Sequence, residues 1–203
     1  MAAASPAVLA LHYQNDVLHR DGRIRVGLAA DDPSRGQLIA AAGRLLAGAR
    51  QNRWPILHVR IAFRPDYADL AQHLPILRRA GELGAVRDGE WGAEFLEALA
   101  PLRDSPIEHV LTHTRISAFA GTPLDQLLQL LNARRVIVAG VATHSVVEST
   151  VREAADRGLA VTVAADACAA ADTAAHHASL ASMRLVATVT DVAGALASDG
   201  DIA

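Results

Sequence analysis

The chain has 203 residues, of which 51% are hydrophobic and 20% charged, so it is long enough and apolar enough to bury a full core. Its formal net charge of −3 and the lack of a lysine or arginine run argue against nucleic acid as a partner. Charged residues and histidines interrupt every apolar run, which argues against a membrane span. The composition therefore favours a soluble protein that forms one compact domain.

The same features give expectations about location. Residues 1–10 have no positively charged start and run directly into a strand-like pattern, so we expect no signal peptide. Cys168 is the only cysteine, which excludes an internal disulfide and fits a reducing compartment. We expect a cytoplasmic protein. Every basic residue is arginine, so no lysine can take part in catalysis.

Short runs rich in β-branched residues alternate with longer alanine- and leucine-rich runs at helical period, a pattern typical of βαβ units. It predicts one α/β domain over residues 1–203, with a core at about 7–197 and a doubly wound, mostly parallel sheet of about six strands. The segment from Ala62 to Asp88 has no clear period and is predicted to be a long loop near the site. The predicted strands are 7–12, 56–61, 109–113, 135–140, 160–164 and 185–189, and the predicted helices are 34–51, 123–131, 145–157, 173–183 and 192–197.

Four segments then carry a resemblance to a known family. The first predicted strand ends in His12, followed by Gln14-Asn15-Asp16; His113 precedes a Ser-Ala-Phe segment that ends at Phe119. A strand leads into Gly140-Val-Ala-Thr-His-Ser145, and Trp91 begins a Trp-Gly-Ala-Glu segment. In this order they resemble the motifs of the isochorismatase-like (cysteine hydrolase) superfamily. The resemblance implies the fold given above and activity on a small molecule.

The resemblance also places the reactive residues and shows that they differ from the family pattern. His12, His113 and Ser145 stand where the family has a catalytic Asp, Lys and Cys. By resemblance, the Val141–Ala142 peptide is expected to be cis, and the amides of Ala142 and Ser145 are expected to form an oxyanion hole.

Several interpretations of these residues stay open. Histidine titrates near neutral pH, so the two histidines can act as acid and base, with Ser145 as nucleophile or as a helix cap. We also expect a substrate pocket that contains Gln14, Trp91, Arg115, Phe119 and His144.

Two alternatives differ in mechanism or in class. In the first, the enzyme forms no covalent intermediate and acts on a vinyl ether, imine or lactone-like substrate, through acid/base chemistry or through a metal. His12 and His113, with His58 or His144, are the candidate ligands for such a metal. In the second, the chain is an inactive binding or partner subunit. We expect no cofactor, a small-molecule substrate of the amide or ester kind, and a homodimer or homotetramer, as in the family.

Overall fold

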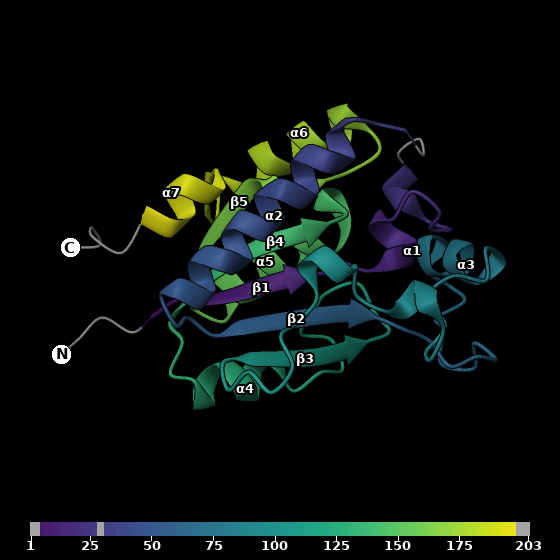
Figure 1. The fold of residues 1–203 in the computed structure, drawn as a ribbon, viewed down its shortest axis with the longest axis horizontal. Coiled ribbons are helices and arrows are strands. Elements are labelled where there is room, and N and C mark those ends of the chain that lie inside the picture. The colour runs from purple at the N-terminus through teal and green to yellow at the C-terminus, as the bar shows by residue number, and fades with distance from the viewer. Residues whose placement is uncertain (1–4, 28–30, 198–203) are drawn as a thin grey trace.

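The computed structural model describes residues 5–27 and 31–197. Within them the strands form one parallel six-stranded sheet in the order β3-β2-β1-β4-β5-β6, which confirms the predicted doubly wound α/β class (Figure 1). The strands are β1 (Ala7–Leu11), β2 (Ile56–Ile61), β3 (Glu108–His113), β4 (Arg135–Val141), β5 (Ala160–Ala169) and β6 (Thr188–Thr190).

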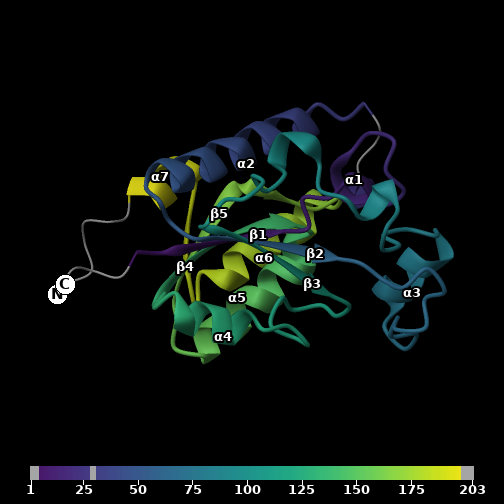
Figure 2. The same cartoon turned by 60° about the horizontal axis from the view of Figure 1, so that its bottom comes forward.

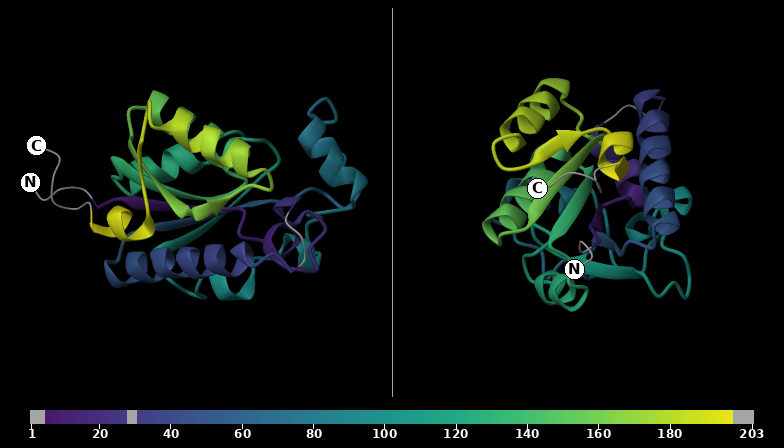
Figure 3. Two further views of the ribbon diagram at one scale, coloured as in Figure 1. Left: turned by 90° about the horizontal axis from the view of Figure 1, so that it is seen from above. Right: turned by 90° about the vertical axis from the view of Figure 1, so that its left-hand side faces the viewer.

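Helices cover both faces of the sheet. The helices α2 (Ser34–Gln51) and α7 (Val192–Ala197) lie on one face, and α4 (Leu124–Leu130), α5 (Glu148–Asp156) and α6 (Thr173–Met183) lie on the other (Figures 2 and 3). Short elements complete the chain: α1 (Asn15–Leu18), α3 (Pro75–Glu82), the 3₁₀ turns 25–27, 91–93 and 97–99, and a π-helical turn, η4 (Thr143–Val147). No helix in the described part of the chain is long and apolar enough to cross a membrane.

Most predicted boundaries agree with these elements, and two strands differ. The strand predicted over 160–164 continues to Ala169 as β5. The helices 34–51, 173–183 and 192–197 begin and end where the sequence predicts. The strand predicted over 185–189 lies instead at Thr188–Thr190, because Val186 and Ala187 still donate backbone hydrogen bonds to the Met183 carbonyl at the end of α6. The apolar residues that suggested a strand therefore belong to a turn, where Leu185 is exposed.

The predicted loop 62–88 contains a helix. The helix α3 starts with Pro75, which suits the first helical turn because its missing N–H has no intrahelical partner there anyway. It buries Leu77 and Ala80 and leaves Arg78 and Arg79 exposed, so only one narrow face is apolar. This helix projects beyond the carboxyl ends of β1 and β2 (Figure 1).

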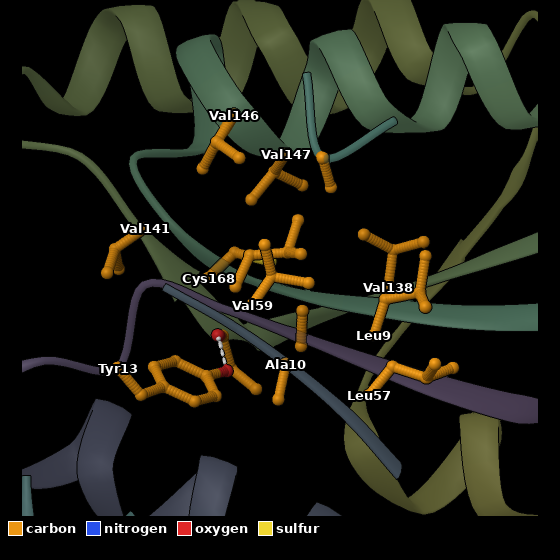
Figure 4. Packing of buried hydrophobic residues seen from close by; sticks show 14 of the residues in the cluster. Leu9, Ala10, Tyr13, Leu57, Val59, Val138, Val141, Val146, Val147 and Cys168 are labelled. Atoms are coloured by element: carbon orange, nitrogen blue, oxygen red, sulfur yellow. Dashed lines mark hydrogen bonds between the residues drawn. The ribbon is translucent and has the colours of Figure 1, made fainter. Parts of the chain in front are cut away.

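The core is built from the central strands and the helices that flank them. Leu9, Leu57 and Val138 are fully buried on neighbouring strands, and Tyr13 is buried just after β1 (Figure 4). The Tyr13 hydroxyl donates to the Ala167 carbonyl at 2.7 Å, so the polar end of this core residue has a partner. This bond ties the end of β1 to β5.

The sheet has its topological switch between β1 and β4, where the strand order runs outward in both directions. In such sheets ligands bind outside the carboxyl ends of the strands at the switch. Gly140 lies at this point, with φ 152°, and a Cβ there would come within 2.4 Å of the Leu11 carbonyl oxygen. The close approach of β1 and β4 therefore requires glycine and brings the residues after both strands together.

Candidate active site

His12 is the first residue after β1 and turns away from the sheet. Its φ of 57° lies in the left-handed region, and its amide still donates to the Val59 carbonyl at 2.8 Å. Only 7% of the residue is exposed, yet its ring lines a cavity at the carboxyl edge of the sheet. His12 is therefore a buried imidazole with access to the region where ligands bind in this fold.

His113 ends β3 and reaches past β2 to His12. The two Nε2 atoms are 2.5 Å apart, and His113 Nδ1 is 3.1 Å from the Ser117 carbonyl oxygen. A carbonyl only accepts, so His113 carries its proton on Nδ1 and its Nε2 is the acceptor. In the neutral pair, His12 then donates through Nε2–H and keeps a lone pair on Nδ1. We call these two residues the histidine pair.

Burial sets the protonation of the histidine pair. It lowers the pKa of His113 from 6.5 to about 4, against the opposing effect of the Ser117 carbonyl. Burial also holds the pKa of His12 well below 6.5, with a further contribution from His113, while the Val141 carbonyl favours the protonated ring. Both rings are therefore neutral at pH 7, which is the state in which a histidine can accept a proton.

The turn that orients His113 is anchored on α5. The Ala118 amide donates to Oγ1 of the buried Thr150 at 3.1 Å, and the Ser117 hydroxyl donates to the Glu153 carboxylate. Phe119 packs in the core beneath the Arg157 guanidinium, 4.5 Å from the ring centre. Phe119 was predicted to line the pocket, but it is a packing residue of this anchor, since the turn directs its ring toward α5.

Ser145 lies in η4, directly after the Val141–Ala142 peptide, which is cis as the resemblance implied. The residue lines the same cavity as His12. Among the described residues the Ser145 hydroxyl has no hydrogen bond to either histidine, whose side chains bond to each other and to the Ser117 carbonyl. The Ser145 amide donates to the Ala142 carbonyl at 3.1 Å. One of the two amides that were predicted to form the oxyanion hole therefore already has a hydrogen-bond partner within the turn.

The cavity has a volume of about 360 Å³ and brings together part of the predicted pocket. Its lining includes Arg115 and His144, as the sequence predicted, and it includes α3, which belongs to the segment 62–88 that was predicted to be a loop near the site. Gln14 and Trp91 do not line it. Gln14 is fully buried and bonds to the backbone of Ile61 and to the Ala93 carbonyl, and Trp91 is 51% exposed with its ring edge against His19.

Asp16 holds the outer wall of the cavity together. One carboxylate oxygen accepts from the Val86 amide at 2.7 Å and the other from the Arg23 amide at 3.0 Å. The wall includes Val86 and Ile24. The carboxylate lies against Gly92, where a Cβ would come within 2.0 Å of it. Asp16 is therefore a structural acceptor between three segments of the chain.

Replacing Asp16 with asparagine is expected to lower the free energy of unfolding by about 2 kcal/mol, because the amide group can accept only one of the two N–H bonds, from Val86 and Arg23, that the carboxylate accepts. Urea denaturation at pH 7 measures the change. The matched control is Asp21→Asn in the same segment, whose side chain is 73% exposed and whose replacement should change stability little. Equal stability of the two variants would contradict this role for Asp16.

The other candidate ligands and nucleophiles do not join the histidine pair. His58 is fully buried on β2, where its Nε2 bonds to Glu108 of β3 at 2.8 Å. Cys168 is buried on β5, and burial raises the pKa of its thiol to about 12, so it is an inert core residue. In the described part of the chain no group of three or more His, Cys, Asp or Glu side chains is placed to hold a metal ion.

The parallel sheet, the switch point and the residues gathered there define a ligand-binding α/β protein with a potential acid/base pair. Residues 6–194 match the Isochorismatase domain family, and the chain belongs to that family, as its sequence motifs predicted.

Similar proteins of known sequence include amidohydrolases. The chain is 30% identical over 177 residues to ureidoacrylate amidohydrolase RutB of Methylobacterium radiotolerans, covering 80% of this chain and 67% of that protein. It is 33% identical over 161 residues to RutB of an Enterobacter species, covering 72% and 67%. A solved isochorismatase family protein from Desulfovibrio vulgaris superposes with a TM-score of 0.79 at 27% identity, covering 95% of this chain and 97% of that one.

Proposed function

We propose that this protein is a hydrolase that cleaves a carbon–nitrogen bond in a small amide-type compound, using the histidine pair as its acid/base group. The observation that carries the proposal is the 2.5 Å contact between His12 and His113 at the end of an apolar cavity. The amidohydrolases among its relatives support the reaction class. The proposed chemistry needs no cofactor, because the base and the acid are both supplied by the chain.

The proton path follows from the tautomers. His12 Nδ1 takes a proton from the attacking hydroxyl group as its oxygen bonds to the amide carbon. The resulting imidazolium shares its Nε2–H with His113, whose ring the Ser117 carbonyl holds in place. When the carbon–nitrogen bond breaks, His12 returns the proton to the leaving nitrogen. His113 thus takes the orienting role that a carboxylate has in a serine hydrolase triad, without the negative charge.

The attacking hydroxyl group belongs either to water or to Ser145. The geometry favours water, because the Ser145 hydroxyl has no hydrogen bond to either ring in the described structure. Ser145 remains the alternative nucleophile because it lines the cavity that His12 lines. The two routes differ in whether an acyl-enzyme forms.

Replacing Ser145 with alanine decides between them. For direct attack by water we expect kcat/KM to stay within about tenfold of the wild-type value, measured by ammonia release from ureidoacrylate and from simple primary amides. The control is Ser149→Ala, on α5 outside the cavity lining. A loss of about a thousandfold or more in the Ser145 variant alone would identify Ser145 as the nucleophile.

The wild-type protein on the same panel tests the proposed function itself. Release of ammonia that depends on His12 supports the hydrolase. The absence of turnover on every C–N, ester and vinyl ether substrate tried would favour the alternative of a binding or partner subunit.

A further inference from the structure

The part of the cavity lining that α3 and the 25–27 turn supply is apolar except for Arg79. The helix α3 contributes Ile76, Leu77 and Ala80, Leu83 follows directly after it, and Val26 of the 25–27 turn lines the same cavity. A small polar amide would leave this surface in contact with water. The shape therefore suits a ligand with an apolar body that extends from the reacting carbon toward α3.

This wall is built into the fold. Leu77, Ala80 and Val26 are each 7% exposed or less, although α3 projects from the sheet. The Tyr67 hydroxyl donates to the Ala85 carbonyl at 2.8 Å, just after α3, and the Asp16 carboxylate holds the next amide, that of Val86. The apolar surface is thus held in position from two sides.

In the described part of the chain, the charged residues that line the cavity are two arginines, Arg79 and Arg115. Arg79 also pairs with the Glu82 carboxylate at 3.3 Å, which offsets part of its charge, so Arg115 is the main cationic group at the cavity. Arg115 uses its Nη1 for bonds to the Asp69 and Thr114 carbonyls and to the Thr114 hydroxyl, and its Nη2 has no protein partner among the described residues. A ligand cation would be repelled at this opening, whereas a neutral or anionic group would be accepted.

Resting on the proposed function, we propose that the substrates are amides whose apolar part is a branched aliphatic or aromatic group, that this part lies between α3 and the 25–27 turn, and that they carry no positive charge. α3 is then the element that selects substrates by size. Each methylene buried there should raise kcat/KM about fourfold until the cavity is filled.

The test is a series of primary amides: acetamide, butyramide, isocaproamide and benzamide. The expected result is a rise in kcat/KM of at least tenfold from acetamide to benzamide. In Ala80→Phe, which fills the apolar space, the ratio of benzamide to acetamide activity should fall at least tenfold. The matched control is Arg78→Phe on the exposed side of α3, which should keep both the ratio and the acetamide activity.

Two benzamides of similar size and opposite charge test whether a positive charge on the substrate is excluded. 4-Carboxybenzamide should be cleaved at least tenfold faster than 4-(aminomethyl)benzamide, in kcat/KM. The opposite order would overturn this part of the proposal.

Calorimetric titration of benzamide and acetamide into the His113→Gln protein keeps the inference separate from the proposed function. If the wild-type protein cleaves no amide, but the His113→Gln protein still binds benzamide at least tenfold more tightly than acetamide, the proposed function fails and the apolar site stands. If amides are cleaved without a preference for size, or if benzamide binds no better than acetamide, the inference about α3 is overturned.

Discussion

Replacing His12 with asparagine is expected to lower kcat/KM by about 10² to 10⁴, the usual range for loss of a positioned acid/base group. Asparagine is the suitable replacement because it tolerates the left-handed backbone that His12 adopts at φ 57°. Its amide can occupy the space of the ring but cannot accept a proton at neutral pH. The loss should therefore appear in kcat, measured by ammonia release, while the fold is kept.

Two further variants define this result. His73→Asn changes an exposed histidine outside the cavity lining and should leave kcat/KM unchanged. His113→Gln removes the Nε2 acceptor that fixes the tautomer of His12 and should also lower kcat substantially. A His12→Asn enzyme within tenfold of wild type, correctly folded by circular dichroism, would show that the histidine pair is not the acid/base group.

The fold was predictable because its signals are local. The helix over 34–51 follows a proline and runs through alanine and leucine at helical period, so its ends could be placed from the sequence. The helix α3 was not predicted, because its eight residues include three charged ones and a glycine and bury a face of only two side chains. Its position depends on tertiary contacts with Asp16 and Tyr67 near its end, which have no local signature.

The site was predictable in its location and less so in its bonding. His12 and His113 both stand at the carboxyl ends of parallel strands, so their approach follows from topology. Their mutual hydrogen bond does not follow from topology. β2 lies between their two strands, and the bond depends on the side-chain conformations that bring the two Nε2 atoms together across it. Gln14 also could be placed near the site from the sequence, but its hydrogen-bond partners could not be predicted. Its buried side-chain amide bonds to the backbone carbonyls of Ile61 and Ala93, which need partners there, and does not face the cavity.

The same burial that keeps the histidine pair neutral should make the protein sensitive to acid. The pKa of His113 is about 4 in the folded state and 6.5 for a solvent-exposed histidine, so below pH 6.5 the unfolded chain binds a proton that the folded chain does not. This stabilises the unfolded state as the pH falls from 6.5 to 4. The stability that His113 contributes is fully present above pH 6.5. Between pH 6.5 and pH 4 its titration lowers the free energy of unfolding by about 3 kcal/mol.

His12 and His58 add to this loss in the same direction, since burial lowers the pKa of each. For His58 the reason is visible in its contacts: Nε2–H donates to Glu108, while Nδ1 is buried without a partner, so a second proton would have no acceptor. Protonation of this ring is opposed even though a carboxylate lies beside it.

Urea denaturation at pH 7.5 and at pH 4.5 measures the effect. The wild type should lose several kcal/mol between the two values, and His113→Gln should lose about 2 to 3 kcal/mol less, because it has no imidazole to titrate in the unfolded chain. His73→Gln, at an exposed position, should show the wild-type loss. A His113→Gln protein that loses as much stability as wild type would mean that His113 is already charged in the folded state, and the neutral pair on which the proton path depends would have to be abandoned.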